Sequence, residues 1–140
     1  MVILDSNIIV YSINTDSVKS RDAQKFIDSN KDNLCITHQN ILESIRVLTH
    51  PKFVTPMHPQ KASDAVWQIS NKLTLISPSN NAILLFRELV NKYKFKDDRI
   101  FDAYLVATAL VNDVSVIATD NVKDFNKISE ISVINPFLVK

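Results

Sequence analysis

The sequence predicts an α/β fold, specifically a three-layer α/β/α sandwich around a short-stranded, mainly parallel sheet. Short apolar runs recur along the 140 residues, and segments with helical periodicity separate them. Strands joined by helices pair in parallel, because the crossover returns the chain to the same end of the sheet. The runs are apolar throughout, which is typical of strands covered on both faces. A chain of this length is expected to form a single domain, residues 1–140.

The N-terminal part begins with a strand, a short helix and an amphipathic helix. A buried strand is expected at residues 2–4, which are all apolar, and the apolar-rich stretch 8–13 follows as a short helix. Residues 19–29 have the periodicity of an amphipathic helix. A second apolar run at 34–36 predicts a strand. A helix at 37–48 follows, since its first residue is threonine, a common N-cap.

The middle of the chain alternates in the same way. Three prolines between residues 51 and 59 predict a loop. A helix at 60–72, a strand at 73–76 and a long helix at 80–93 are expected next. Residues 94–99 are mostly charged and are predicted to connect that helix to the next one.

The last third contains the most apolar helix and the last two strands. The helix is expected at 100–111, and the strands at 115–118 and 130–134. The chain contains no glycine, so asparagine and aspartate are expected to form its tight turns, since they tolerate the left-handed backbone better than other residues. Many of its Asn and Asp residues therefore need no chemical role.

The composition excludes several classes of protein. The absence of glycine rules out a P-loop and a GxGxxG dinucleotide site. A single cysteine, Cys35, allows neither an internal disulfide nor a zinc-finger cluster. No apolar run reaches the roughly 18 residues of a membrane span, and Asp5 follows the N-terminus too soon for a signal peptide. We expect a cytoplasmic protein that does not bind a membrane. Its net charge of +1 restricts any nucleic-acid contact to a local basic patch.

Some acidic and amide side chains directly follow predicted strands, whereas Glu43 lies in the helix after the second strand and Asp102 in the first turn of the helix before the fourth. In chain order the candidates are Asp5, Glu43, Asp102, Asp120, Asn121 and Asp124. The carboxyl ends of parallel strands meet at one edge of a sheet, where sites form. Clustered carboxylates repel one another, so such a cluster needs a cation, and oxygen ligands favour Mg²⁺ or Mn²⁺.

Each acid also has a purely structural explanation. Asp5 fits an N-cap, Asp102 fits the positive end of a helix dipole, and Glu43 fits a solvated helix face. Asp120 and Asp124 fit turns. However, Asp102 shares a helical stripe with core residues, which is a costly place for an unpaired charge. The shared edge is the main argument for a site.

Four short segments then carry a family resemblance, and they span nearly the whole chain in the family's order. They are residues 3–7 (ILDSN), 41–43 (ILE), 101–109 (FDAYLVATA) and 118–125 (ATDNVKDF). The chain resembles a PIN-domain ribonuclease of the VapC type, the toxin of a toxin–antitoxin pair; residues 134–137 (INPF) also match. The resemblance implies four catalytic acids at Asp5, Glu43, Asp102 and Asp124.

The resemblance also implies a function. It predicts a Mg²⁺-dependent (or Mn²⁺-dependent) endoribonuclease that hydrolyses RNA phosphodiester bonds, forms a homodimer and binds a cognate antitoxin. Asp5 and Asp102 would be the principal metal ligands. Further candidate site residues are Asp120, Asn121, Ser6 and Thr119. The candidate RNA contacts are Arg46, Lys94, Lys96 and Arg99, although these also fit a solvated charge run.

Three other functions stay open at this point. A housekeeping RNA-processing PIN nuclease would have the same sequence features as a toxin. A catalytically inactive PIN-like module would bind RNA or protein only, although retention of the four acids argues against it. A phosphorylated receiver or a phosphatase would have a second acid beside Asp5, which the sequence lacks.

Overall fold

The structure is a computed structural model that describes residues 1–138. Its strands form one five-stranded sheet of order β3-β2-β1-β4-β5 in which every neighbouring pair is parallel. The strands are β1 (Val2–Leu4), β2 (Leu34–Thr37), β3 (Thr74–Ile76), β4 (Val116–Ala118) and β5 (Ser132–Ile134). The expected number of strands and their parallel pairing are confirmed.

The helices agree with the sequence pattern except for two short ones. The long helices are α1 (Ser6–Ile13), α2 (Ser20–Asn30), α3 (His38–Thr49), α4 (Pro59–Ser70), α5 (Asn80–Tyr93) and α6 (Arg99–Val111). A short helix α7 (Val122–Phe125) and a 3₁₀ turn η1 (Lys31–Asn33) were not predicted, since three or four residues are too few to give a helical period.

Three strands begin later than the apolar pattern predicts, and the one expected at 115–118 begins at Val116. The strand expected from residue 73 begins at Thr74, because the Leu73 N–H donates to the Ser70 carbonyl at 3.1 Å and closes a turn. In the same way the Ile131 N–H donates to the Ile128 carbonyl at 3.2 Å. The strand expected at 130–134 therefore begins at Ser132.

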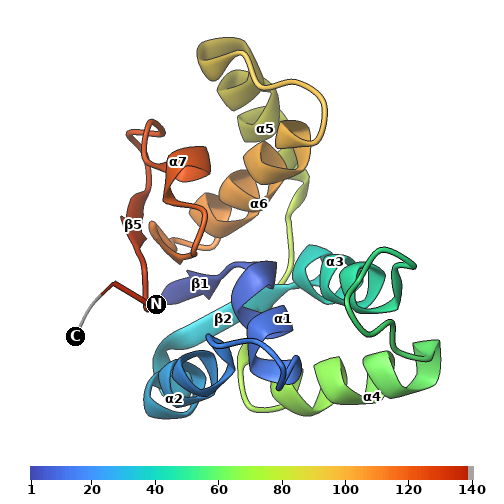
Figure 1. Ribbon diagram of the computed structural model, residues 1–140. Helices are drawn as coiled ribbons and strands as arrows, with labels where there is room; N and C mark the ends of the chain where they lie inside the picture. Colours follow the sequence, from blue (N-terminus) through green and yellow to red (C-terminus); the bar gives the residue numbers. More distant parts are fainter. Residues whose placement is uncertain (139–140) are drawn as a thin grey trace.

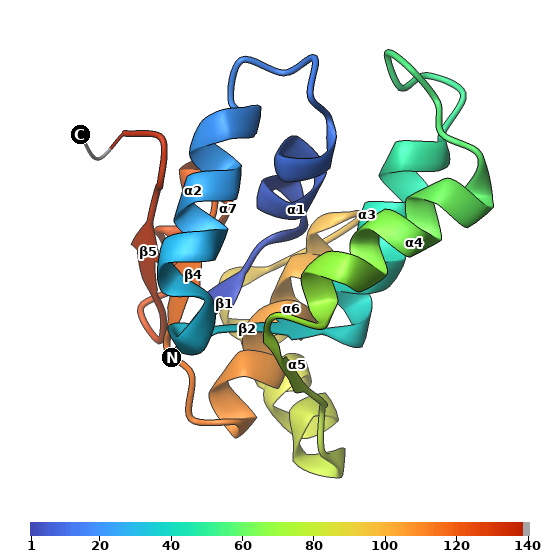
Figure 2. The same cartoon turned by 90° about the horizontal axis from the view of Figure 1, so that it is seen from below.

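The sheet lies between two helical layers, which confirms the α/β/α sandwich. Helices α1 to α4 cover one face and α5 to α7 the other (Figure 1), and the view from below in Figure 2 has α1 to α4 in front. Each face has its own apolar core. Ile3 packs with the α5–α7 layer, whereas the next residue, Leu4, packs with the α1–α4 layer. Successive side chains of a strand point to opposite faces, so both layers are anchored on the central strand.

Cys35 is one of the core residues. It is fully buried in β2, and burial raises the pKa of its thiol to about 11. The thiol is therefore protonated at neutral pH and behaves as a small hydrophobic side chain. The expectation of a buried core cysteine is confirmed.

Left-handed backbone is used where a glycine would be common. Asp97 and Asp113 have φ of 55° and 60°, as expected for aspartate in tight turns. Lys94, which ends α5, has φ of 60°, and a lysine at this position was not expected. Asp97 and Lys94 both lie in the connection between α5 and α6, so that connection is a compact pair of turns.

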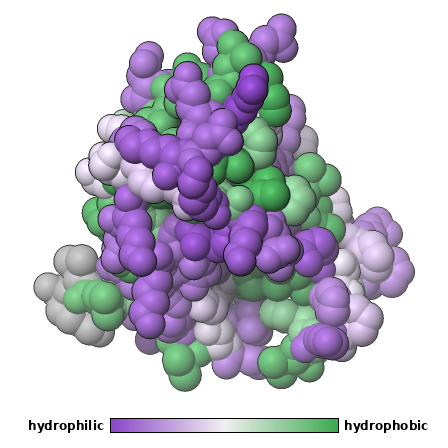
Figure 3. All heavy atoms as spheres, turned by 90° about the horizontal axis from the view of Figure 1, so that it is seen from above, coloured by the Kyte–Doolittle hydropathy of each residue, from purple (hydrophilic) through white to green (hydrophobic). Residues whose placement is uncertain are grey.

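The surface is mixed in polarity. Figure 3 views the side on which α5 lies, and it shows apolar patches between polar side chains. Ile83 and Leu84 of α5 are 56% and 61% exposed. None of the helices in residues 1–138 combines the length and the apolar character needed to cross a membrane.

The register of the central strands sets the position of the site. Leu4 of β1 pairs with Ala118 of β4, and the Asp5 N–H donates to the Ala118 carbonyl at 2.9 Å. Asp5 and Thr119 therefore leave the sheet side by side. From β1 the chain continues to β2 and β3 on one side, whereas β4 and β5 lie on the other. The carboxyl ends of β1 and β4 thus mark the topological switch point of the sheet, where α/β sheets place their sites.

Candidate functional site

Asp5 lies at the centre of the edge and also caps α1. Its backbone is extended, and its Oδ1 accepts a hydrogen bond from the Ser6 N–H at 2.7 Å. Its Oδ2 accepts from Thr119 Oγ1 at 2.6 Å. Only 8% of Asp5 is exposed, so these hydrogen bonds hold its carboxylate in a largely dry place. The N-cap explanation for Asp5 is therefore correct in geometry, and it fixes the carboxylate in one orientation.

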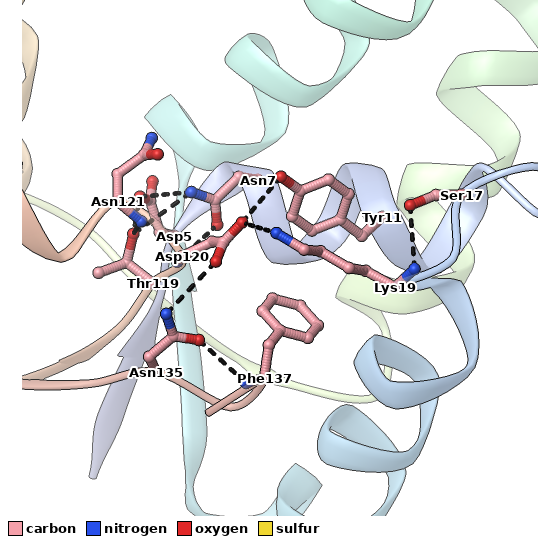
Figure 4. A network of polar contacts seen from close by, with 10 residues as sticks. All are labelled: Asp5, Asn7, Tyr11, Ser17, Lys19, Thr119, Asp120, Asn121, Asn135 and Phe137. Carbon is pink, nitrogen blue, oxygen red and sulfur yellow. Dashed lines mark hydrogen bonds and ion pairs between the residues drawn. The ribbon is translucent and has the colours of Figure 1, made fainter. Parts of the chain in front are cut away.

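Thr119 joins the ends of β1 and β4 through its hydroxyl group. It is fully buried, and its Oγ1 accepts from Asn7 Nδ2 at 3.3 Å and from the Asn121 N–H at 2.9 Å while it donates to Asp5 (Figure 4). Asn7 also donates to Asp5 Oδ2 at 3.3 Å. Asn121 is exposed and contacts this network through its backbone. The sequence analysis did not select Asn7, although its position two residues after Asp5 suits such a contact.

Glu43 lies on α3, and hydrogen bonds link it to α1 directly and to α6 through Gln39. Its Oε2 accepts from Ser6 Oγ at 3.4 Å, and its Oε1 accepts from Gln39 Nε2 at 2.6 Å. Gln39 also donates to the Phe101 carbonyl of α6 at 2.8 Å. The buried Asn40 donates to Ser6 Oγ at 3.2 Å. Gln39 and Asn40 are further contacts that sequence reasoning missed.

The start of α3 explains why Asn40 is fixed. Thr37 caps the helix, as expected, and accepts from the Asn40 N–H at 3.1 Å. Asn40 Oδ1 in turn accepts from the Thr37 N–H at 2.9 Å, which completes a capping box. The T-x-x-N spacing was the available signal in the sequence, since asparagine here takes the place of the usual Glu or Gln.

Asp102 and Asp124 lie on the α5–α7 side of the edge and share an arginine. Arg99 Nε is 3.1 Å from Asp102 Oδ2 and 3.9 Å from Asp124 Oδ1. Arg99 Nη2 also donates to the Asp124 backbone carbonyl. The Asp102 side chain is 27% exposed and that of Asp124 is 39% exposed. One cation therefore bridges acids from two helices.

The electrostatics show that acids from four segments lie within range of one another. The pKa of Asp5 is raised to about 6, first by burial and also by the charges of Glu43 and Asp124, against the hydrogen bonds from Thr119 and Ser6. The pKa of Asp102 is raised to about 7, first by burial and then by the charges of Asp5 and Asp124, against the effect of Arg99. The structure thus brings Asp5, Glu43, Asp102 and Asp124 to one edge.

The chemistry of this donor set fits a divalent cation. The side chains are carboxylates supported by hydroxyl and amide groups, which are the oxygen donors that Mg²⁺ and Mn²⁺ take. Asp5 and Asp102 have raised pKa values, so a further positive charge would lower the energy of both ionised forms. In residues 1–138 as they lie, no three His, Cys, Asp or Glu side chains are gathered closely enough to enclose an ion.

The Asp120 backbone N–H donates to Asn7 Oδ1 at 3.5 Å, but its carboxylate contacts other partners than Asp5 does. The Asp120 carboxylate forms an ion pair with Lys19 and accepts from Tyr11 Oη at 3.0 Å and from Asn135 Nδ2 at 3.3 Å (Figure 4). Burial alone would raise its pKa, but the hydrogen bonds from Lys19, Tyr11 and Asn135 hold it below the usual value. The Lys19 ammonium also lies 5.3 Å from the centre of the Phe137 ring. These contacts tie the C-terminal segment to α1 and give Asp120 a structural role.

The basic candidates divide into two groups. Lys94 and Lys96 are exposed in the connection before α6, and Arg46 is exposed on α3, three residues after Glu43. None of these three has an ion pair with a residue in the range 1–138. Arg99, by contrast, is engaged with the acids.

Comparisons with solved structures agree with this architecture. A toxin–antitoxin complex from Klebsiella pneumoniae matches with a TM-score of 0.71 at 19% identity, covering 99% of this chain and 100% of that one. VapBC2 from Rickettsia felis, bound to a DNA fragment from its promoter, matches with a TM-score of 0.72 at 17% identity and coverages of 96% and 98%. At these identities the likeness shows the fold alone.

A third solved structure is similar in the same degree. VapC20 of Mycobacterium tuberculosis, described as a sarcin–ricin loop cleaving toxin, matches with a TM-score of 0.71 at 13% identity, covering 94% of this chain and 99% of that one. No curated protein sequence matches this chain. The family model of the PIN domain matches residues 2–131, which is nearly the whole chain. The chain therefore belongs to the PIN-domain family.

Proposed function

We propose that this protein is a metal-dependent endoribonuclease whose catalytic centre is formed by Asp5, Glu43, Asp102 and Asp124. The observation that carries the proposal is the convergence of these four acids, from separate segments, at the switch point of the sheet. Asp5 and Asp102 are the two acids whose pKa values are raised, chiefly by burial, and they are the proposed principal ligands of Mg²⁺ or Mn²⁺. Perturbed acids in a crevice are typical of functional sites.

The proposed site residues would have different roles in the reaction. A divalent cation at such a site supplies Lewis-acid activation of water and offsets charge on the scissile phosphate. Asp5 is oriented for this task by Thr119 and Ser6. Glu43 accepts a hydrogen bond from Ser6, and its charge acts on Asp5. Glu43 would therefore orient the attacking water or accept a proton from it. No histidine takes part in this scheme.

RNA would be held by basic side chains around the acids. Lys94, Lys96 and Arg46 are exposed and have no ion-pair partner in the described part of the chain, so they are available for phosphate oxygens. Asn121 is exposed close to Thr119 and would supply a polar contact to RNA or to a water molecule. Contacts of this kind bind the backbone of the nucleic acid without selecting a sequence.

We further propose a place in a toxin–antitoxin pair, with action in the cytoplasm. The similar solved structures include toxin–antitoxin complexes and a toxin that cleaves the sarcin–ricin loop, which supports both an antitoxin partner and an RNA substrate. A homodimer is also proposed, and Ile83 and Leu84 offer exposed apolar surface on α5 for it. A particle of monomer size at micromolar concentration would contradict the dimer.

The test is cleavage of single-stranded RNA by the purified chain, with Mg²⁺ and with EDTA in its place. Cleavage is expected with the metal only, and it should be lost in Asp5→Asn. The matched control is Asp113→Asn, since Asp113 is exposed in a turn away from the four acids. A folded wild-type protein that binds RNA and does not cleave it would instead support an inactive binding module.

The toxin role has its own test. Expression of the wild-type chain should arrest growth, and Asp5→Asn should abolish the arrest. Co-expression of a small DNA-binding protein encoded immediately upstream should restore growth. RNA cleavage without any effect on growth would favour a housekeeping RNA-processing nuclease.

A further inference from the structure

Arg99 stands out because its guanidinium group is committed to the acidic site. Its Nε lies 3.1 Å from Asp102 Oδ2 and 3.9 Å from Asp124 Oδ1, and its Nη2 donates to the Asp124 carbonyl. Across residues 1–138 no other Lys, Arg or His nitrogen lies within 4.0 Å of a carboxylate oxygen of the four acids. The guanidinium carbon is also 5.0 Å from the centre of the buried Phe95 ring. The acids and the Phe95 ring therefore fix the position of the Arg99 guanidinium group.

The position of Arg99 on its helix is unfavourable in itself. It is the first residue of α6, and a positive charge there opposes the helix dipole. Phosphate binding does not explain these contacts either. Arg99 Nε and Nη2 both donate to oxygen atoms of the protein itself, the carboxylate of Asp102 and the carbonyl of Asp124. Lys94 and Lys96, in the same connection, stay exposed without an ion-pair partner in the described residues. Attraction to Asp102 and Asp124 is the force that accounts for the placement.

The oxygens that Arg99 contacts are ones that a metal ion would need. Asp102 Oδ2 and Asp124 Oδ1 belong to two of the four acids, and no three ligating side chains in residues 1–138 enclose an ion as they lie. We propose that Arg99 is an internal counter-ion that neutralises Asp102 and Asp124 in the metal-free protein and that the divalent cation must displace. The proposal rests on the metal site of the proposed function and gives Arg99 a positioning role there.

Displacement has two measurable consequences. Without Arg99 the metal-free protein keeps the repulsion among Asp5, Asp102 and Asp124 and loses the bridge between α6 and α7, so it should be less stable. Metal binding should become tighter, because the cation no longer competes with a fixed positive charge. If Arg99 only shaped the site, its removal would weaken metal binding. If Arg99 only bound RNA, its removal would leave the metal affinity unchanged.

The experiment compares Mn²⁺ binding by calorimetry, and thermal melting in EDTA, for the wild-type chain and Arg99→Gln. Both are measured without RNA at about pH 8, where the carboxyl groups of Asp5 and Asp102 are mostly ionised. Arg99→Gln should bind Mn²⁺ about fivefold more tightly, which corresponds to about 1 kcal/mol, the upper end for a partly exposed ion pair. Its metal-free melting temperature should be lower by about 2–4 °C.

Two further variants complete the design. Arg99→Lys keeps the charge and should bind Mn²⁺ within about twofold of the wild type, and it serves as the test if the Gln variant fails to fold. Arg87→Gln removes the same charge from the exposed face of α5 and should change neither quantity. Unchanged or weaker Mn²⁺ binding by folded Arg99→Gln overturns the counter-ion proposal alone. Absence of Mn²⁺ binding by the wild-type chain overturns the metal site as well.

Discussion

Replacement of Asp102 by Asn distinguishes two possible roles of this residue, a metal ligand and an acid that only interacts with the dipole at the start of its helix. Asparagine keeps the size of the side chain and removes the negative charge that a divalent cation requires. The pKa of Asp102 is raised from 3.8 to about 7, so the folded protein favours its neutral form. Asparagine imitates that neutral form. The variant should therefore lose RNA cleavage and, without metal, should be more stable than the wild type, with a gain that grows from about pH 4 and is complete above about pH 7.

The size of the gain follows from the shift. About three pKa units correspond to about 4 kcal/mol for a fully buried group. The Asp102 side chain is 27% exposed, and the variant loses its ionic contact with Arg99, so the expected gain is reduced to about 1–2 kcal/mol. For a chain of this size the melting temperature should rise by about 3–8 °C. If Asp102 only interacted with the helix dipole, about 0.3–1 kcal/mol would be lost instead.

The assay combines thermal melts at about pH 8, with EDTA and with Mg²⁺, and an RNA cleavage reaction. The control is Asp98→Asn. Asp98 directly precedes α6 and makes no side-chain capping hydrogen bond, and its replacement removes an equal charge from the same end of the helix. The control should retain cleavage and the stabilisation by Mg²⁺. An Asp102→Asn protein that cleaves at a near wild-type rate, with the same stabilisation by Mg²⁺, would refute the assignment.

Three further predictions can be tested on the same material. The metal-free protein should lose stability as pH rises from about 4 to about 7, because the folded pKa values of Asp5 and Asp102 lie above their unfolded values; the raised pKa of Asp5 by itself accounts for about 3 kcal/mol, and urea unfolding that is flat across this range would contradict it. Cys35→Ala should keep its cleavage rate within about twofold and lose about 1 kcal/mol, and near-total loss of cleavage by the folded variant would contradict the core role of Cys35. Asp120→Asn should cost about 1 kcal/mol in chemical unfolding through its ion pair with Lys19 yet still cleave RNA; loss of cleavage with unchanged stability would make Asp120 a site residue.

Much of the fold could be predicted because local signals and burial agree. The apolar runs at β1 and β2 are buried on both faces of a central sheet region, and the helices between strands have regular apolar spacing. The spatial order of the strands could not be predicted, since it is a property of long-range packing. The short helix α7 could not be predicted either, because four residues have no measurable helical period.

The convergence of the acids could be predicted from the sequence, whereas the contacts that hold them could not. Asp5 could be selected because it directly follows a strand. Its partner Thr119 is 114 residues away, and only the register of β1 with β4 brings the two together. In the same way Lys19 reaches Asp120 across 101 residues, so no local pattern could have separated Asp120 from the four converging acids.

A divalent cation is proposed to bind among the acids at the carboxyl edge of the sheet. Anomalous X-ray diffraction from crystals soaked in Mn²⁺ would locate such an ion. We expect a strong anomalous peak that contacts the carboxylates of Asp5 and Asp102, with the Arg99 guanidinium displaced from Asp102. A Mn²⁺ ion bound elsewhere, without contact to Asp5 and Asp102, would refute the proposed site.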